Sequence, residues 1–330
     1  MRVAVLSGDC IGPEVSAEAM RVLEALVPQI ELVELPFGAE AIRQRGDPLP
    51  AATLEACRSA DAVLKGPIGH PEFDAADIRP EQGLLRLRAE LDVYANLRPA
   101  RQGSVDLLIV RELVGGMYFG ARGVREDGTV FDTCEYHPQQ VERICRRAFE
   151  LARSRRGHVT SVDKANILDT SRMWRRVATD VGRDFPDVIV DHMLVDNAAM
   201  QLVERPERFD VIVTENMFGD ILSDEAAAIT GGLGLAGSAS LGDGSPGLFE
   251  PVHGSAPDIA GTGTANPAAM LRSTALMLSL GLGRPDEARL LEHAVDAALE
   301  TAPTPDLGGV ATTREFGDAV LTALEVRSPL

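Results

Sequence analysis

Two aspartates four residues apart carry the clearest chemical signal in the chain. Asp220 and Asp224 lie in the string FGDILSD, directly after an apolar string that favours a strand. At the helix start that we expect there, both carboxylates lie on one helical face and repel each other unless a cation binds between them. Mg²⁺ prefers oxygen ligands and fits such a pair. A solvated helix face is the alternative, because carboxylates are also favoured near a helix N-terminus.

Three arginines lie in sequence contexts that favour anion binding. Arg88 and Arg98 flank the string AELDVYANL, and Arg111 follows an apolar string that predicts a strand. Ligands of α/β proteins bind beyond the carboxyl ends of buried strands, and guanidinium groups bind carboxylates bidentately. Three such groups together would suit a polycarboxylate, whereas each arginine alone fits an ordinary surface ion pair.

Two further side chains are candidates for proton transfer. Lys164 follows a predicted strand in SVDKAN, and Tyr118 lies in GGMYFG. Beside a bound metal, the pKa of a Lys or Tyr can fall into a range useful for catalysis. A structural lysine at a strand end is the competing interpretation. The segment 250–267 is rich in glycine and proline, a composition that favours wrapping a ligand with backbone.

The elements that must position these residues alternate between short apolar strings and longer helical patterns. This alternation indicates an α/β fold with a largely parallel sheet. The predicted strands span residues 3–6, 60–66, 106–113, 158–163, 187–195 and 209–214. The predicted helices span about 15–26, 51–59, 139–156, 171–183, 197–204 and 221–228.

The segment 118–137 departs from this alternation. Its aromatic and β-branched residues surround an Asp-Gly pair at 127–128, which predicts an extended hairpin or arm. An arm that cannot bury both of its faces within one subunit suggests dimerisation. A surface hairpin of a single subunit fits the pattern equally well.

A glycine motif at 232–237 matches G-x-G-x-x-G, with Asp258 about twenty residues later. The dinucleotide-binding fingerprint requires a strand before the glycines and a helix that opens within them. Here a helical string precedes the motif, and we expect the small residues at 237–247 to form a loop. We therefore interpret the motif as a flexible connection between structural units.

Composition limits the classes of protein to which the chain can belong. The 330 residues are 45% hydrophobic, and 32 Lys and Arg face 50 Asp and Glu for a net charge of −18. This balance argues against disorder and against nucleic-acid or anionic membrane partners. Four cysteines without C-x-x-C spacing favour reduced thiols and a cytoplasmic location. The N-terminus favours a buried strand over a signal sequence, and no apolar stretch is long enough for a bilayer span.

Eight strings, in order along nearly the whole chain, resemble the β-decarboxylating dehydrogenases, the isocitrate and isopropylmalate dehydrogenase family. They are GDCIGPEV (8–15), GPIG (66–69), GLLRLRAELDVYANLRP (83–99), VRELVGGMYFG (110–120), SVDKANIL (161–168), FDVIVTENMFGDILSD (209–224), HGSAPDIAGTGTANP (253–267) and TPDLGG (304–309). The resemblance implies an open, two-domain αβα sandwich that is not a Rossmann fold. Residues 1–93 and 232–330 would form the cofactor-binding domain. Residues 94–231 would form the metal, substrate and dimerisation domain, with the arm at about 118–137.

The resemblance also implies a role for each candidate residue. Tyr118 and Lys164 would be catalytic. The substrate would be bound by Arg88, Arg98, Arg111, Leu84 and Leu85, and Mg²⁺ or Mn²⁺ would be bound by Asp220 and Asp224. The cofactor would be bound by Ile11, Glu81, His253, Gly254, Ser255, Ala256, Pro257, Asp258, Ile259 and Asn266. Asp196 would complete the metal and substrate site, and both Asp196 and Lys164 would serve the site of the partner subunit in a homodimer. The carboxylate of Asp258 would repel a 2′-phosphate, which favours NAD over NADP.

The implied reaction is the oxidative decarboxylation of a 2-hydroxy dicarboxylate. Hydride passes from C2 to NAD, Lys164 accepts the hydroxyl proton, CO₂ leaves, and Tyr118 assists protonation at C3. Leu84 and Leu85 match the apolar pair of the branch that acts on 3-isopropylmalate in leucine biosynthesis. Two leucines cannot hydrogen-bond the third carboxylate of isocitrate. Another 3-alkylmalate, homoisocitrate, D-malate or tartrate remains an alternative substrate, and a non-catalytic homologue is a third hypothesis.

Three positions depart from the family pattern. Cys10 replaces the glycine that is usual in the first loop, and Asn197 follows Asp196 where a small residue is common. The connection from Pro99 to Asp106 is short. These departures affect the surroundings of the site and its exact specificity, while every candidate ligand and proton-transfer residue is present.

Overall fold

The computed structural model describes residues 1–244 and 246–327, which divide into two compact units. One unit contains Met1–Asp92 together with the chain from Leu233 onward, and the other contains Val93–Gly232. Each unit is a sheet covered by helices, which confirms the predicted α/β class with mainly parallel strands. Within the described ranges, no helix has both the length and the apolar character needed to cross a bilayer.

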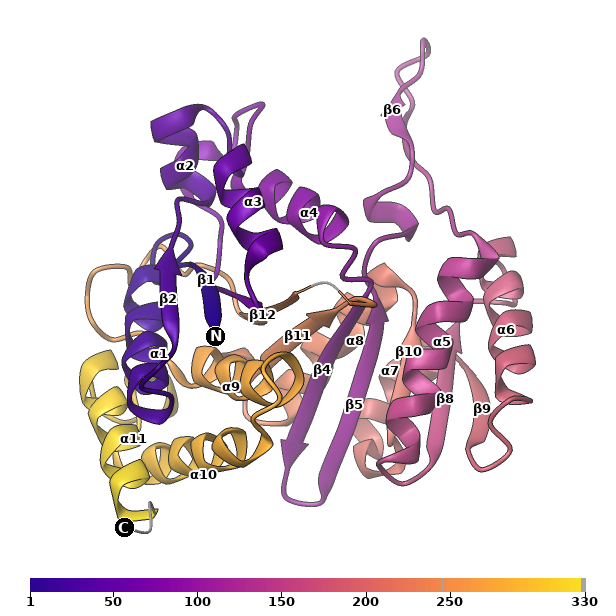
Figure 1. Cartoon of the computed structure of the whole chain (residues 1–330). Coiled ribbons are helices and arrows are strands. Elements are labelled where there is room, and N and C mark those ends of the chain that lie inside the picture. The colour runs from indigo at the N-terminus through magenta and orange to yellow at the C-terminus, as the bar shows by residue number, and fades with distance from the viewer. Residues whose placement is uncertain (245, 328–330) are drawn as a thin grey trace. The chain divides into compact units, whose positions relative to one another are not determined.

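The first unit is built from both ends of the chain (Figure 1). Its strands lie in the order β2 (Glu31–Glu34), β1 (Arg2–Leu6), β3 (Ala62–Lys65), β12 (Gly247–Pro251) and β11 (Gly237–Leu241), and only β11 is antiparallel to its neighbour β12. Its helices are α1 (Gly12–Leu26), α2 (Gly38–Arg45), α3 (Ala51–Ser59), α4 (Pro80–Glu90), α9 (Ala268–Leu276), α10 (Pro285–Thr301) and α11 (Thr313–Arg327). Short turns of helix are η1 (Pro71–Phe73), η4 (Leu233–Leu235), the π-helical η5 (Met277–Gly281) and η6 (Pro305–Leu307). The central strand β3 is buried along its whole length, as parallel strands covered on both faces require.

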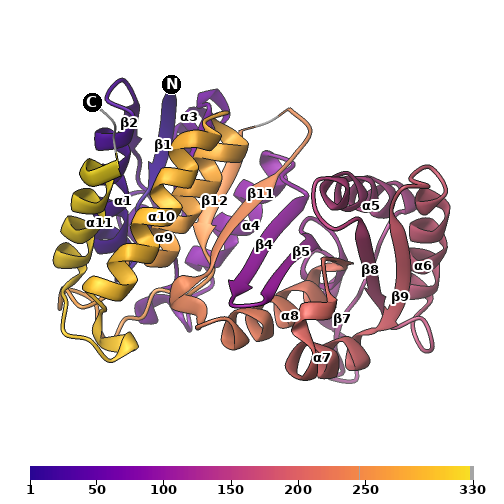
Figure 2. The ribbon, with the colours of Figure 1, turned by 90° about the horizontal axis from the view of Figure 1, so that it is seen from below.

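The second unit has strands in the order β4 (Ala95–Gln102), β5 (Val105–Glu112), β10 (Val211–Thr214), β8 (His158–Asp163) and β9 (Ile189–Leu194). The pair β4 and β5 is antiparallel, and the remaining pairs are parallel. Its helices are α5 (Pro138–Arg153), α6 (Asp169–Gly182), α7 (Val195–Glu204) and α8 (Asn216–Ile229), with the short turns η2 (Gly116–Tyr118) and η3 (Pro206–Arg208). Helices α7 and α8 lie on one face of these strands and α5 lies on the other (Figure 2). Ile109, Ile212 and Leu222 belong to the core between the sheet and α8.

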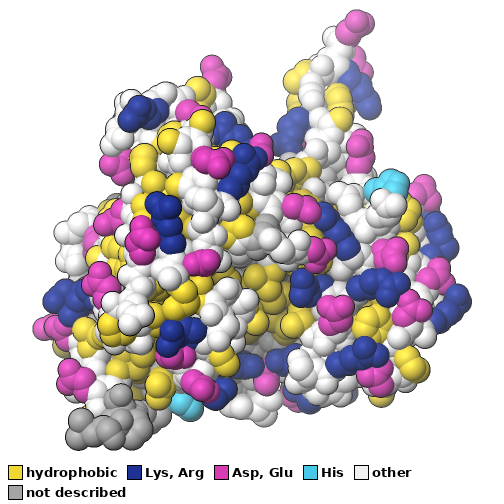
Figure 3. All heavy atoms as spheres, viewed as in Figure 1, with side chains coloured by type: hydrophobic (Ala, Val, Ile, Leu, Met, Phe, Trp, Pro, Cys, Tyr) yellow, Lys and Arg dark blue, Asp and Glu magenta, His cyan; other side chains and the backbone are white. Residues whose placement is uncertain are grey.

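The predicted hairpin within 118–137 is confirmed. Strands β6 (Arg122–Val124) and β7 (Val130–Asp132) pair antiparallel, and Gly128 takes the positive φ of 84° that the turn requires. The hairpin projects from the rest of its unit, and Figure 3 shows apolar side chains among the charged ones on it. Val124 and Val130, which pair across the hairpin, are 69% and 72% exposed, so these apolar side chains of the arm are open to solvent.

Two predictions about the segment after β10 are wrong. The helix that we expected to begin at about residue 221 is α8, which begins at Asn216. The earlier start follows from a cap directly after the strand, because the carboxylate of Glu215 accepts a hydrogen bond from the amide of Phe218 at 2.9 Å. Residues 237–241, expected in a loop, form β11. Small residues suit this strand because helix α9 packs closely on it, and a Cβ on Gly237 would lie 2.7 Å from the amide nitrogen of Ser273. The glycine motif itself is not a dinucleotide loop, since helix α8 precedes it and η4 lies within it.

Candidate functional site

Two arginines and two aspartates of the second unit meet beneath helix α8. Arg98 lies on β4, and Arg111 is the last residue but one of β5. Asn96 pairs in register with Arg111 and lies two residues before Arg98, so both arginines lie on the same face of the sheet. Asp220 and Asp224 lie one turn apart on α8, as their spacing predicted. The structure therefore brings together Arg98, Arg111 and the acidic pair.

Hydrogen bonds connect these four side chains directly. Arg98 donates to Asp220 at 3.2 Å and to Asp224 at 3.1 Å, and Arg111 donates to the same Oδ1 of Asp220. Burial raises the pKa of the Asp224 carboxyl, Arg98 opposes that shift, and the negative charge of Asp220 adds to it. The two carboxylates thus lie close enough to repel each other, and the arginines supply the compensating positive charge.

Close approach of α8 to β5 depends on Gly219. A Cβ at this position would lie 2.7 Å from Cγ and 2.8 Å from Cβ of Arg111, which is closer than atoms can pack. Because glycine has no Cβ, the long side chain of Arg111 lies directly against the helix and is only 2% exposed. The glycine before the first aspartate of FGDILSD is therefore part of the site geometry, which the sequence reasoning missed.

Tyr118, at the end of η2, points to the acidic pair. Its hydroxyl donates to Oδ2 of Asp220 at 2.9 Å, and the guanidinium carbon of Arg111 lies 5.7 Å from its ring centroid. Burial raises the pKa of the Tyr118 hydroxyl, and the charge of Asp220 raises it further. The tyrosine therefore holds its proton and presents it beside the carboxylate.

Lys164 and Asp196 form a separate ion pair in the same unit. Lys164 follows β8, Asp196 lies in the first turn of α7, and Nζ is 2.7 Å from Oδ1. The hydrogen bond from Lys164 lowers the pKa of the Asp196 carboxyl. Among residues 1–244 and 246–327, no three His, Cys, Asp or Glu side chains are grouped so that they could hold a metal ion. Within one chain, Asp196 is thus not grouped with the acidic pair on α8.

Arg88, the third predicted arginine, lies in the first unit on helix α4. It is 8% exposed and donates to Oε1 of Glu250 at 2.9 Å, while Nζ of Lys65 lies 2.8 Å from Oε2. Burial alone would raise the pKa of Glu250, but Lys65 and Arg88 together lower it to about 2. Sequence reasoning missed this buried pair of partners, although Lys65 ends a buried apolar strand in the same way as Arg111.

Leu84 and Leu85 precede Arg88 by one turn on α4. Both side chains are half-buried, and Glu81 is exposed one turn earlier. The spacing Glu81, Leu84, Arg88 follows one face of the helix. This face therefore combines an apolar surface with a cation and leads towards Gly69, where a Cβ would lie 3.1 Å from Oε1 of Glu81.

The predicted cofactor loop packs against the first loop of the chain, within the first unit. The amide of Ile11 donates to the carbonyl of Ser255 at 3.1 Å, and the Ser255 hydroxyl donates to the carbonyl of Gly69 at 2.6 Å. Glu14 of α1 accepts hydrogen bonds from the amides of Gly261 and Gly263, which ties the far end of the loop to the same helix. The loop is therefore held in place through its backbone amides and carbonyls together with the Ser255 hydroxyl, and its wrapping of a ligand stays a prediction.

The remaining predicted cofactor residues lie along this loop. Burial lowers the pKa of His253, while Gly254, Pro257 and Asp258 are exposed and Ile259 is half-buried. Ala256 takes a positive φ of 41°. Asn266 is buried, accepts from the amide of Ala268 at 2.9 Å and donates to Asp306 at 3.1 Å. Asp258 thus presents a carboxylate at the surface of the loop.

Cys10 adopts a conformation that favours glycine. Its φ is 54°, and its thiol lies 3.6 Å from the carbonyl oxygen of Gly69. The left-handed region costs a non-glycine residue roughly 1–2 kcal/mol.

The variant Cys10→Gly tests this conformational strain. Glycine removes the strain from the folded state but also adds conformational entropy to the unfolded chain, so we expect the free energy of unfolding to rise by about 1 kcal/mol at most. Urea unfolding of the two proteins measures this, with Cys57→Ala, a buried thiol in a helix, as the control that should destabilise.

Comparisons with known proteins cover almost the whole chain. Residues 2–320 match the family described as isocitrate/isopropylmalate dehydrogenase. The chain is 51% identical to a 3-isopropylmalate dehydrogenase of Zymomonas mobilis, over 98% of this chain and 100% of that protein. It is 49% identical to a 3-isopropylmalate dehydrogenase of Shouchella clausii, over 99% and 98%.

Solved structures match the fold to the same extent. An isocitrate dehydrogenase of Methylococcus capsulatus superposes with a TM-score of 0.91 at 38% identity, over 98% of this chain and 99% of that one. A β-decarboxylating dehydrogenase of Thermococcus kodakarensis superposes with a TM-score of 0.86 at 38% identity, over 98% and 96%. Both the sequence and the arrangement of elements are thus similar to one group of enzymes from end to end.

Proposed function

Because the chain belongs to the isocitrate/isopropylmalate dehydrogenase family, we propose that it oxidatively decarboxylates (2R,3S)-3-isopropylmalate to 4-methyl-2-oxopentanoate and CO₂ with NAD and Mg²⁺ or Mn²⁺. The observation that carries the choice of substrate is the apolar pair Leu84 and Leu85 one turn before Arg88 on α4. This face can bind a carboxylate and an alkyl group together, whereas a third carboxylate against two leucines would lose hydrogen bonds to water. The named relatives support the same choice and a role in leucine biosynthesis.

The donor set on α8 fits a divalent cation. Asp220 and Asp224 offer hard oxygen ligands from successive turns, and their mutual repulsion is relieved when a cation binds between them. A cation at this position supplies Lewis acidity that stabilises negative charge on the substrate oxygen. We propose Asp196 of the partner subunit as the third carboxylate.

The loops of the first unit fit NAD. The loop 253–259, which exposes Asp258, contacts Ile11 through its backbone, and Gly69 lies close to both Ser255 of this loop and Glu81. Asn266 follows in the same segment of the chain. The carboxylate of Asp258 can accept hydrogen bonds from ribose hydroxyls and repels a 2′-phosphate, so NAD is preferred over NADP. NAD, held by these residues, would supply the acceptor for the hydride of C2. We therefore propose the first unit as the cofactor domain and the second as the metal and substrate domain.

The chain's own residues bind and protonate the substrate. The guanidinium groups of Arg88, Arg98 and Arg111 bind its carboxylates. Lys164, contributed across the dimer, accepts the proton of the C2 hydroxyl in its neutral amine form, and Oδ1 of Asp196, 2.7 Å from Nζ, fixes the direction of the side chain. Tyr118 holds its proton beside Asp220 and assists protonation at C3 after CO₂ leaves.

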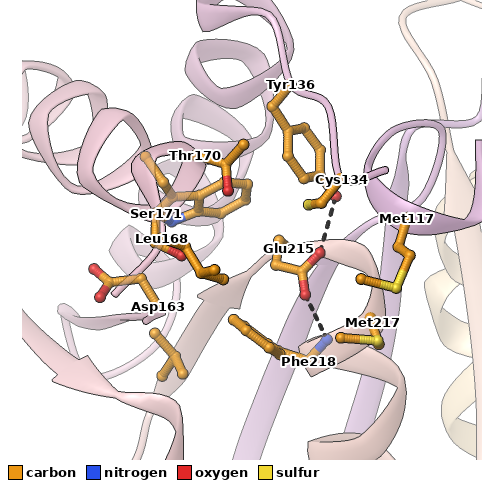
Figure 4. Close-up of a pocket in the computed structure, with 12 residues that line it drawn as sticks. Met117, Cys134, Tyr136, Asp163, Leu168, Thr170, Ser171, Glu215, Met217 and Phe218 are labelled. Carbon is orange, nitrogen blue, oxygen red and sulfur yellow. Dashed lines mark hydrogen bonds between the residues drawn. The ribbon is translucent and has the colours of Figure 1, made fainter. Parts of the chain in front are cut away.

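Exposed apolar side chains of the second unit support a homodimer. Met200, Val203 and Ile221 on α7 and α8 are 50%, 63% and 59% exposed, and the arm exposes Val124 and Val130. A mainly apolar pocket also opens at the base of the arm, between Met117, Leu168 and Met217 (Figure 4). Exposed apolar surface of this kind favours association. We propose that a second copy of the chain covers it, and the four free thiols favour the cytoplasm as its location.

A substrate panel tests the proposed function. We expect Mg²⁺-dependent formation of NADH with 3-isopropylmalate to exceed that with other 3-alkylmalates, isocitrate, homoisocitrate, D-malate and tartrate, and NADP to be used poorly. The same panel on Leu85→Ser should shift the ratio of kcat/KM values towards isocitrate. Faster turnover of isocitrate or homoisocitrate by the unmodified enzyme would contradict the leucine argument. Binding of NAD without turnover of any substrate would instead indicate a non-catalytic homologue.

A further inference from the structure

The orientation of Arg111 is set by a buried asparagine, Asn216, at the first position of α8. Both Nε and Nη2 of Arg111 donate to Oδ1 of Asn216, at 2.9 and 2.7 Å. The two residues are 2% and 1% exposed. Two hydrogen bonds from one edge of a guanidinium to one oxygen fix its rotation about the Cδ–Nε bond, and hence the direction of the opposite edge.

Asn216 is in turn held from two sides. Its Nδ2 donates to the carbonyl of Gly115 at 3.0 Å, so its Oδ1 has to face Arg111. Its backbone amide donates to the hydroxyl of Tyr136 at 2.9 Å, and that hydroxyl donates to Glu215 at 3.3 Å. Figure 4 shows the side chains of Tyr136 and Glu215 directed towards each other beside the pocket. The acceptor is thus fixed before any substrate arrives.

Arg98 has the same kind of partner. Its Nε donates to Oδ1 of Asn96 at 2.9 Å, and Asn96 is fully buried opposite Arg111 in the β4 and β5 register. Each arginine is therefore oriented through Nε by a neutral amide oxygen. A carboxylate in the same place would orient the guanidinium equally well but would cancel much of its positive charge.

We propose that Asn216 is a positioning residue, which orients Arg111 for the substrate carboxylate without adding a second negative charge to that of Asp220, which Arg111 already contacts. The inference rests on the proposed function only in naming that carboxylate as the ligand. Asn216 is expected to act through Arg111, and therefore to affect binding of the hydroxy dicarboxylate and not of NAD, which we place on the first unit. Asn96 would do the same for Arg98.

Three variants of the full-length enzyme separate orientation from charge and from stability. Asn216→Ala removes the acceptor, and Asn216→Asp keeps it but adds a negative charge. Thr214→Val is the matched control. Thr214 lies beside Arg111 in the register of β10 and β5, and the substitution deletes its buried hydrogen bond of 2.9 Å to the carbonyl of Val162 but leaves the acceptor on Asn216 in place. The readouts are KM for 3-isopropylmalate, KM for NAD, kcat, and the rate at which the Nε–H of Arg111 exchanges with water. Nitrogen-15 NMR measures the last, with the resonance assigned by its loss in Arg111→Lys.

We expect Asn216→Ala to raise KM for isopropylmalate by about tenfold or more, with a smaller change in kcat and no change in KM for NAD. Exchange of the Nε–H of Arg111 with water should become faster by a similar factor. Asn216→Asp should raise KM comparably while exchange stays slow, and Thr214→Val should leave both unchanged. Slow exchange in Asn216→Ala, or a KM no higher than that of Thr214→Val, would overturn the proposal. A normal KM in Asn216→Asp would overturn the argument about charge. If the unmodified enzyme does not turn over isopropylmalate, the proposed function fails, while NMR exchange still decides whether Asn216 orients Arg111.

Discussion

Replacement of Lys164 by alanine is expected to reduce kcat by about 10²–10⁴-fold, which is the usual contribution of a general base. The side chain is a positioned amine, since Nζ is held 2.7 Å from Oδ1 of Asp196 and is only partly exposed. NAD affinity should stay within experimental error, because the proposed cofactor residues lie in the first unit and Lys164 lies in the second. Stopped-flow measurement of NADH formation and calorimetric titration with NAD provide the two numbers.

A matched control for this variant is Arg172→Ala. Arg172 lies close by in sequence on α6 and forms an exposed ion pair with Asp169, so its loss removes a more exposed cation from the same region. Such surface pairs contribute little to stability. If Lys164→Ala weakens NAD binding, or if Arg172→Ala slows turnover to the same degree, Lys164 has a structural role and not the proposed catalytic one.

The second large effect is expected from Asp224→Asn. Removing one charged ligand should raise the Mg²⁺ concentration for half-maximal activity by at least about tenfold. It should also reduce kcat/KM by about 10²-fold or more, because Lewis-acid stabilisation is worth several kcal/mol. Asp224 is the cleaner choice of the pair, since Asp220 also accepts from Arg98, Arg111 and Tyr118. Titration of activity with Mg²⁺ and with Mn²⁺ measures the effect.

Glu225→Gln is the control for Asp224→Asn, because it removes one carboxylate from the adjacent position of α8. Burial raises the pKa of Glu225, and no arginine contributes to that shift. Its metal dependence should match that of the unmodified enzyme. An equal shift in the two variants would mean that the general charge of the helix, and not a ligand, attracts the cation.

The two inactive variants together test whether the sites are shared. If Lys164 serves the partner's site, a dimer of one Lys164→Ala chain and one Asp224→Asn chain has one site with both residues intact. Random mixing of the variants, followed by subunit exchange, should then restore about a quarter of the unmodified activity. No recovery in a mixture that has demonstrably exchanged subunits would place Lys164 in the site of its own chain.

The sequence predicted much of the second unit because its signals are local. Buried strands such as β5 and β10 contain continuous apolar strings, and the spacing of Asp220 and Asp224 requires only helical geometry. Strand β11 was missed for the opposite reason. Its small residues reflect the closeness of α9, which is a tertiary constraint that no local pattern contains.

The same distinction applies to the site. Arg98, Arg111 and the acidic pair were found individually, and the structure adds the residues that orient them. Asn216 was overlooked because an asparagine at a helix start reads as an ordinary cap. The interaction of Lys65 with Glu250 could not be predicted, because the pairing of β3 with β12 brings together residues far apart in the chain.

That pairing has a consequence for the order in which the protein can be made. As the chain leaves the ribosome, residues 1–92 supply only β2, β1 and β3 of the first unit, and Lys65 emerges long before its buried counter-ion Glu250. A buried ammonium without its partner is costly, so β3 must stay hydrated at this stage. The second unit is continuous in sequence and is synthesised in full before β12 appears. Synthesis therefore favours folding of the second unit first, and the sheet of the first unit is completed only after the C-terminal segment has been translated.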